Sequence, residues 1–411
     1  LLLNFLTITT EFIGISLALA YFGVSKFVAI PIAAATLIAI TTTGSFRRWE
    51  RAMFVFLAVS LLVIPLAVMA HPDPVAMAKG YLVPSIHGGL TSNAALLIIA
   101  IVGTTVAPWQ LFFQQSNVID KRITPRWFAY EKADTVIGSV VVVIGASAII
   151  MATASVFTGT SAFGHFSDAL SIAQGFHQRN SYLLGAIYAI FLFDASIVGA
   201  SAVTLATSYA FGDVFGLRHS LHRGFREARL FYGTYAGMVL VAAGLVLVAN
   251  DYIASLITVA VQALAGVLLP SASVFLVLLC NDTAVLGPWI NKPWLNIVAT
   301  VIVSVLLELS LILIVSTIFT AIDATQLVTV LTAVLVVAMV VATFLILRSR
   351  TRPPRMSTEE KANWRMPALA LLQPAQWSLG RRVAVLAMQA YLGVAVLLLI
   401  VKAVQIAIGH H

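Results

Sequence analysis

The chain is organised by long apolar runs, each of the length that crosses a lipid bilayer. A helix needs about 20 apolar residues to span the hydrocarbon core, and runs of roughly 18 or more are typical of such helices. Only 10% of the 411 residues are charged, against roughly 25% in soluble domains. The sequence predicts an all-α polytopic membrane protein with eleven spans, at about 3–23, 27–44, 50–70, 94–119, 134–157, 182–212, 229–249, 252–280, 294–320, 325–347 and 383–407.

The basic residues are divided unequally between the two sides that these spans define. Twenty of the 24 Lys and Arg residues fall on one side, and the other side holds only Lys26, Lys79, Arg179 and Lys402. Because cytoplasmic loops carry the excess of Lys and Arg, the rich side is predicted to be cytoplasmic. The sequence therefore predicts a multi-pass protein of the cell membrane with its C-terminus outside. Its basic loops are predicted to face anionic lipid rather than nucleic acid.

The fourth run is interrupted near its middle by Gly103 and Pro108. Proline has no N–H, and its ring crowds the carbonyl four residues back, which belongs to Thr104. A freed carbonyl is tolerated at membrane depth only inside the protein or beside a water-filled cavity. In transporters such helix breaks hold ions, so the run predicts a binding site at 103–108.

A stripe of amide side chains follows the break. Gln110, Gln114 and Asn117 recur at helical spacing and therefore share one face. The stripe predicts the wall of a hydrated path toward the cytoplasm. A simple proline kink, with the amides bonded to neighbouring helices, is the alternative.

Polar groups in three other runs are further candidates. Glu11 and Asp194 lie deep in the first and sixth runs, where a carboxylate is costly and indicates function. We expect both to line the path; a protonated carboxyl bonded between helices is the alternative. Gln262 precedes Pro270 in the eighth run and is suited either to a cation or to the backbone that Pro270 opens.

Motifs of the common enzyme classes do not occur in the sequence. It has no Gly-rich phosphate loop beside a lysine, no His/Cys cluster at zinc spacing and no nucleophile elbow. No predicted span holds a histidine. The sequence therefore predicts a transporter that is not an enzyme and needs no cofactor.

Three segments resemble a known family. The segment at 103–113 (GTTVAPWQLFF) resembles the sixth helix of the Nramp divalent-metal transporters, 10–19 (TEFIGISLAL) their third, and 261–272 (VQALAGVLLPSA) their tenth. The resemblance implies the LeuT-like fold, with two inverted five-helix repeats and a metal site at the midplane. On this basis we expect the rest of the first repeat at 1–70, an extracellular loop at 71–93, the second repeat at 94–281 and three peripheral helices at 282–411.

The same resemblance implies the ligands of a divalent metal ion. The family's main-chain carbonyl falls on Thr104, its methionine on Ala107 and its glutamine on Gln262. The family's Asp-Pro-Gly motif does not occur, since the sole Asp-Pro pair is Asp73–Pro74 in an outward loop. We therefore expect the first two family helices to be missing from this sequence, with an inactive fragment as the alternative.

Departures from the family pattern bear on the cargo. A thioether favours softer transition metals, and Ala107 removes it. Trp109 and Ile8 replace a histidine and an acidic residue of the family's proton route. The pattern is similar to that of the Nramp-related magnesium transporters. It implies passive, uncoupled movement of hydrated Mg²⁺, with Mn²⁺ tolerated, by alternating access.

Three other functions stay open at this stage. Glu11 keeps a proton-coupled Mn²⁺ or Fe²⁺ transporter possible, because one deep carboxylate suffices to relay protons. An amino-acid permease has the same helix-breaking architecture. A structural membrane subunit or a degenerate fragment is the non-transport alternative. The sequence gives no indication of the oligomeric state.

Overall fold

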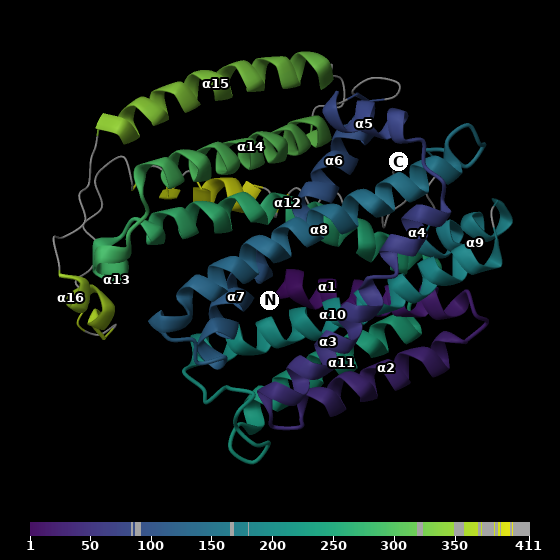
Figure 1. Ribbon diagram of the computed structural model, residues 1–411, viewed down its shortest axis with the longest axis horizontal. Coiled ribbons are helices and arrows are strands. Elements are labelled where there is room, and N and C mark those ends of the chain that lie inside the picture. Colours follow the sequence, from purple (N-terminus) through teal and green to yellow (C-terminus); the bar gives the residue numbers. More distant parts are fainter. Residues whose placement is uncertain are drawn as a thin grey trace. The chain divides into compact units, whose positions relative to one another are not determined.

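The computed structural model describes residues 1–83, 85–86, 92–164, 168–179, 181–318, 324–348 and 357–368, together with 371, 382, 385–386, 388–394 and 397. Throughout these residues the regular elements are helices (Figure 1). The chain forms two units. Unit 1 comprises Leu1–Ser85 and Trp109–Val261, and unit 2 comprises Ile86–Pro108 and Gln262–His411.

Unit 1 holds most of the first two thirds of the chain. Its helices are α1 (Leu2–Ala20), α2 (Lys26–Thr41), α3 (Phe46–Ser60), α4 (Val63–Met69), α5 (Pro74–Leu82), α7 (Pro108–Asp120, from Trp109 onward), η1 (Pro125–Trp127), α8 (Phe128–Phe157), α9 (Ala169–Arg179), α10 (Tyr182–Phe215), α11 (Arg229–Val248) and the start of α12 (Asp251–Cys280).

Unit 2 holds α6 (Ser92–Thr105), the remainder of α12, α13 (Thr283–Leu286), η2 (Gly287–Trp289), α14 (Pro293–Ile318), α15 (Ala324–Arg348) and α16 (Thr358–Asn363). Within it, α14 packs against both α6 and α15.

Helix α10 is the central element of unit 1. It contacts α1, α3, α4, α9 and α11 (Figure 1). Its 34 residues begin at the N-cap Ser181, whose side chain accepts a hydrogen bond from the Leu184 N–H, and end at Gly216 in the left-handed conformation. Asp194, Ser201, Thr207 and other polar residues of its middle part are buried. A helix that is apolar all round with inward polar groups suits the centre of a membrane bundle.

Helices α1 and α10 pack against each other in antiparallel orientation and approach closely. Asn4 Nδ2 donates a hydrogen bond to Thr207 Oγ1 at 2.9 Å. A Cβ placed on Gly14 would lie 2.2 Å from Ser196 Oγ, so this glycine lets the helices approach closely at the other end of the contact. Small residues at such crossings are typical of membrane helices.

Seven described helical segments are long and apolar enough to cross a membrane, one of them formed by α3 and α4 together. Two shorter apolar helices occur at Lys26–Thr41 and Gln326–Val341. These nine coincide with nine of the eleven predicted spans. The predicted span at 94–119 is divided into α6 and α7, and most of the one at 383–407 lies outside the described residues.

Other local differences from the predicted spans have identifiable causes. The span at 50–70 is divided into α3 and α4, because Pro65 cannot bond the carbonyl of Leu61, where α3 ends. The predicted loop at 71–93 contains α5, which the sequence analysis missed although Asp73 caps it and Pro74 is its first residue. Helix α9 was missed in the same way, between the fifth and sixth predicted spans.

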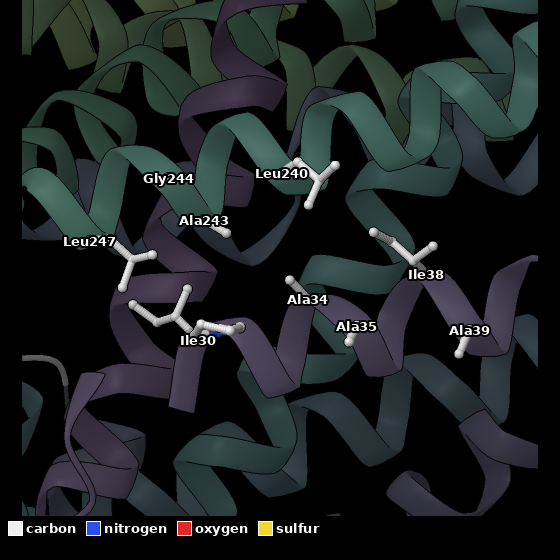
Figure 2. A pocket seen from close by; sticks show the side chains of 10 residues that line it. Ile30, Ala34, Ala35, Ile38, Ala39, Leu240, Ala243, Gly244 and Leu247 are labelled. Carbon is white, nitrogen blue, oxygen red and sulfur yellow. The ribbon is translucent and has the colours of Figure 1, made fainter. Parts of the chain in front are cut away.

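An apolar groove of about 530 Å³ lies between α2 and α11 (Figure 2). Small residues such as Ala35, Ala39 and Gly244 leave the space between larger ones such as Ile38 and Leu247. Its side chains offer carbon atoms alone, so the groove is not a candidate metal site.

Candidate functional site

The helix break predicted from Pro108 is the first component of the site. Helix α6 ends at Thr105 and α7 begins at Pro108, so Val106 and Ala107 lie between the two helices. The hydroxyls of Thr104 and Thr105 both donate to the Ile101 carbonyl, at 3.2 Å and 2.6 Å. The Thr104 hydroxyl is therefore already bonded within α6.

Helices α6 and α12 touch through their backbones beside this break. A Cβ placed on Gly103 would lie 2.3 Å from Gly266 Cα and 2.4 Å from its nitrogen. Gln262 lies one turn before Gly266 and Pro270 one turn after it, so the three share a face of α12. Pro270 has no N–H to donate to the Gly266 carbonyl. Both residues of this contact, and both prolines, belong to unit 2.

The predicted ligand positions differ in exposure. Ala107 is buried and Gln262 half-buried, whereas Thr104 is exposed. The crossing places Thr104 one residue from Gly103 and Gln262 one turn from Gly266. Among the described residues, no group of three or more His, Cys, Asp and Glu side chains is arranged to hold a metal ion. The roles of Thr104, Ala107 and Gln262 as ligand positions stay predictions.

The amide stripe lies on α7, in unit 1. Gln114 is exposed and donates from Nε2 to Thr135 Oγ1 of α8 at 3.2 Å. Gln110 and Asn117 are half-buried on the same helix. A role in lining a path stays a prediction for all three.

Glu11 lies against bare backbone of α10. A Cβ placed on Gly199 would lie 2.4 Å from Glu11 Oε1 and 2.6 Å from its carboxyl carbon. The carboxyl group therefore occupies the space that any side chain at position 199 would fill. The sequence analysis did not predict this dependence on Gly199, because it joins residues far apart in the chain.

Asp194 bonds within the helix bundle. Its Oδ2 accepts a hydrogen bond from Ser60 Oγ of α3 at 2.5 Å, and its Oδ1 is buried without a hydrogen bond from the described residues. Ser201, two turns later on α10, accepts from Trp49 Nε1 at 3.0 Å. This polar face of α10 thus packs on α3, and its role in the path stays a prediction.

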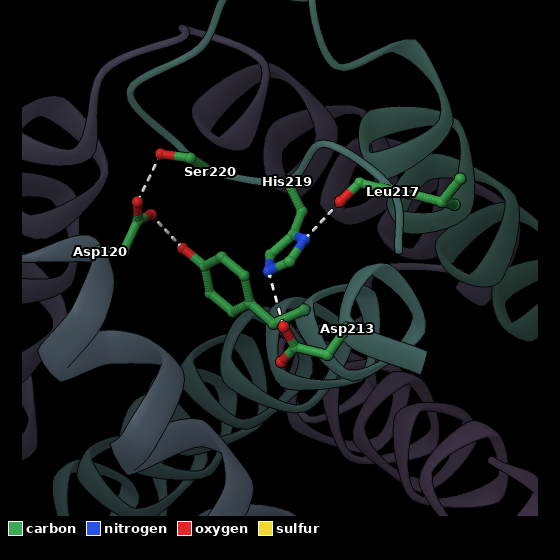
Figure 3. Close-up of polar contacts among 6 residues, drawn as sticks. Asp120, Asp213, Leu217, His219 and Ser220 are labelled. Carbon is green, nitrogen blue, oxygen red and sulfur yellow. Dashed lines mark hydrogen bonds and ion pairs between the residues drawn. The ribbon is translucent and has the colours of Figure 1, made fainter. Parts of the chain in front are cut away.

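A buried cluster around Asp120 was missed entirely (Figure 3). Asp120 ends α7, and its carboxylate accepts hydrogen bonds from Tyr209 of α10, from Ser220 Oγ at 2.5 Å and from the Leu221 N–H at 2.9 Å. His222 Nε2 lies 2.9 Å from the Asp120 carbonyl oxygen. The end of α7 is thereby fixed to α10 and to the α10–α11 connection. The only sequence signal was an acidic residue directly before the basic loop at 121–122.

A second aspartate in this cluster is more exposed. His219 Nε2 lies 3.1 Å from Asp213 Oδ1, and its Nδ1 lies 2.7 Å from the Leu217 carbonyl oxygen (Figure 3). The side chain of Asp213 is 63% exposed. Asp120 is thus buried and Asp213 largely exposed, so substitutions of the two test how burial affects the contribution of each aspartate to stability.

Comparison with known proteins decides the family. The sequence model described as Nramp, natural resistance-associated macrophage protein-like, matches residues 1–316. The chain belongs to the Nramp family. The predicted family is confirmed, and so is an all-α membrane protein with the LeuT-like fold of Nramp transporters.

Curated relatives agree with this family. The divalent metal cation transporter MntH of Bacillus subtilis is 28% identical over 328 residues, which cover 75% of this chain and 71% of the relative. MntH of Lacticaseibacillus casei is 28% identical over 287 residues, covering 66% and 61%. MntH of Levilactobacillus brevis is 26% identical over 290 residues, covering 66% and 60%. The alignments thus span about three fifths of the last two relatives. The family is one of transporters rather than enzymes.

Proposed function

We propose that this Nramp protein carries divalent metal cations across the membrane, with Mg²⁺ as the main cargo and Mn²⁺ accepted. The observation that carries the proposal is the crossing of α6 and α12 at Gly103 and Gly266, beside a helix break in α6 and one turn from Gln262. Half-helix ends and unwound carbonyls are what transporters use to hold cations. The curated relatives of the chain are named as divalent metal cation transporters.

The donor chemistry favours a hard cation. The Thr104 carbonyl and the Gln262 amide supply neutral oxygens, which suit Mg²⁺ and Mn²⁺. Ala107 supplies a methyl group and no sulfur at the position where the family carries methionine. Because Mg²⁺ gives up its waters reluctantly, we propose that it binds as a hydrated ion with part of its shell retained.

We further propose that transport is passive and not coupled to protons. Ile8 is fully buried in the apolar core of unit 1, and Trp109 packs against that core. Neither side chain takes up a proton, although both stand where the family carries proton-handling residues. The concentration gradient of the metal ion, together with the membrane potential, would then drive net transport by alternating access.

Glu11 supports a second candidate, a proton-coupled Mn²⁺ or Fe²⁺ transporter. Its carboxyl group lies against Gly199, inside the helix bundle of unit 1. A side chain that carries protons across the membrane would also have to lie inside such a bundle. The two candidates differ in whether metal entry moves protons.

The deciding experiment is metal uptake by vesicles that contain the full-length protein. External Mg²⁺ or Mn²⁺ is added while one dye reports luminal metal and another reports luminal pH. We expect uptake of both metals without acidification of the lumen. Acidification that depends on metal entry would establish the proton-coupled alternative instead.

A pair of variants tests the site itself. Gln262→Ala removes an amide ligand and should lower uptake about tenfold or more, since a lost hydrogen bond or ligand to a charged group costs about 1.5–3 kcal/mol. Thr104→Ala keeps the main-chain carbonyl and should retain uptake. Equal, unchanged uptake by both variants would favour a structural role for this crossing.

The proposed orientation follows from charge. Twenty of the 24 Lys and Arg residues lie on one side of the predicted spans. We propose that this side is cytoplasmic, that the protein resides in the cell membrane and that its C-terminus lies outside. A reporter protease site placed after position 411 would be cleaved from outside in intact cells if the orientation is right.

A further inference from the structure

Unit 1 contains a polar cavity in addition to the apolar groove between α2 and α11. Its volume is about 600 Å³, and it lies among the starts of α3 and α8 and the connection after α7. We call it the interfacial cavity. Its charged lining residues are Arg47 and Glu50 of α3, Lys121 and Arg122 of the connection, and Glu131 and Asp134 of α8.

The lining carries both signs of charge. Lys121 Nζ lies 3.9 Å from Glu50 Oε1, so these two charges offset each other. Two cations, Arg47 and Arg122, and two carboxylates, Glu131 and Asp134, are left. The two carboxylates are three residues apart and share one face of α8. A purely anionic ligand would meet them with repulsion, and a purely cationic ligand would be repelled by the arginines; a zwitterion pairs with both.

Arg122 occupies a position that normally requires glycine. The Ile123 N–H bonds the Val118 carbonyl and the Arg122 N–H bonds the Ile119 carbonyl, which is the Schellman end of a helix. Arg122 is the left-handed residue of this turn, with φ of 56°. A non-glycine residue is strained in this conformation, so the Arg122 side chain is held in the turn at a local cost in conformational free energy.

The surroundings of the cavity are those of a membrane surface. Helix α8 and the α3–α4 segment are both candidate spans, and both begin at the cavity. Trp127 and Tyr130 line it while remaining 49% and 69% exposed, as aromatic residues do at the lipid interface. Beyond it α8 exposes apolar side chains, including Val136, Ile137 and Val140, along which acyl chains can lie.

We propose that the interfacial cavity binds the headgroup of a zwitterionic phospholipid that ends in a primary ammonium, as in phosphatidylethanolamine. Arg47 and Arg122 donate charge-assisted hydrogen bonds to the phosphate. Glu131 and Asp134 accept from the ammonium, which has three donors. Phosphatidylglycerol lacks the ammonium, and phosphatidylcholine lacks N–H donors. This site does not depend on the identity of the transported ion.

Native mass spectrometry of the full-length protein, delipidated in detergent, tests this site. The probes are phosphatidylethanolamine, phosphatidylglycerol and phosphatidylcholine with identical chains, and chain-free glycerophosphoethanolamine. We expect phosphatidylethanolamine to bind at least about fivefold more tightly than the other two lipids, since one additional hydrogen bond typically contributes about that factor. The chain-free compound should bind much more weakly, because it lacks the contact with α8.

Charge variants identify the site within the protein. Arg122→Gly relaxes the strained turn while removing the cation, and Arg47→Gln removes the other; each should lower phosphatidylethanolamine binding about fivefold. Glu131→Gln with Asp134→Asn should abolish the preference over phosphatidylglycerol. Arg126→Gln is the matched control, because Arg126 stacks at 5.5 Å over the Trp127 ring without lining the cavity.

Three results would overturn the proposal. One is phosphatidylglycerol binding as tightly as phosphatidylethanolamine to the unaltered protein. Another is no loss of phosphatidylethanolamine binding in the Arg122 and Arg47 variants, with both variants folded as judged by thermal unfolding. The third is equal binding of the chain-free compound, which would identify a soluble phosphoester as the ligand in place of a lipid.

Discussion

Gly103 of α6 lies directly on Gly266 of α12, so closely that a Cβ on Gly103 would fall 2.3 Å from the Gly266 Cα. The nearest atoms are backbone, which cannot rotate away as a side chain can. Each glycine is followed by a proline within five residues, Pro108 after Gly103 and Pro270 after Gly266. The position of the helix break relative to Gln262 therefore depends on two residues without side chains.

Gly103→Ala tests this contact. The added methyl forces α6 and α12 apart, and overpacking of this kind costs about 1–3 kcal/mol. We expect a lower unfolding temperature in detergent and a loss of metal uptake by vesicles. The matched control is Gly138→Ala on α8, where a Cβ would meet nothing within 4 Å. Equal effects of the two substitutions would mean that the crossing does not constrain the site.

Asp120 and Asp213 form a natural pair for a second test. Asp120→Asn leaves the donors Tyr209, Ser220 and Leu221 competing for fewer acceptors in a buried site, where an unsatisfied group costs about 1–3 kcal/mol. Asp213→Asn breaks a largely exposed ion pair with His219, and such pairs are worth about 0–1 kcal/mol. Urea unfolding followed by tryptophan fluorescence should rank Asp120→Asn as the more damaging change. The reverse order would show that α7 is not held through Asp120.

Local chemistry made much of the fold predictable from the sequence. Apolar length located the long helices, and the missing N–H of Pro108 located the end of α6 within three residues. The missing N–H of Pro65 divides the span at 50–70 by the same chemistry, but that division was not predicted. Helices α5 and α9 were missed because apolar length was the only criterion, and both are short.

The tertiary partners of the candidate residues could not be predicted in this way. Glu11 depends on Gly199, and Gly103 on Gly266, although more than 150 positions separate each pair in the sequence. No local sequence pattern shows that Gly199 packs against a carboxyl group or that Gly103 packs against the backbone of another helix. Asp120 was overlooked for a related reason, since its partners on α10 and the α10–α11 connection become visible only in the folded chain.

Glu11 is expected to act through its carboxyl oxygens. Glu11→Gln keeps the shape of the side chain against Gly199 but replaces one carboxyl oxygen with an amide nitrogen that cannot accept from the ion or its waters. Loss of such an interaction with a charged group costs about 1.5–3 kcal/mol, so Mg²⁺ uptake should fall about tenfold or more. Gly199→Ala should have a similar effect by displacing the carboxyl group, because its Cβ would lie 2.4 Å from Oε1. Gly237→Ala on α11, where a Cβ meets nothing within 4 Å, is the control. Unchanged uptake in Glu11→Gln would assign this carboxyl group to helix packing.

Ala107 offers the sharpest test of the cargo. Ala107→Met restores a thioether beside the helix break, and thioethers favour soft cations over Mg²⁺. We expect this variant of the full-length protein to bind Cd²⁺ about tenfold more tightly, which corresponds to about 1.4 kcal/mol. Isothermal titration calorimetry measures the affinity. Mg²⁺ uptake should fall in the same variant, because the larger side chain takes space from the ion's water shell. Ala107→Leu fills a similar volume without sulfur and should lower Mg²⁺ uptake without any gain in Cd²⁺ binding. If both variants bind Cd²⁺ equally, position 107 does not face the ion, and the proposed selectivity for Mg²⁺ must arise elsewhere.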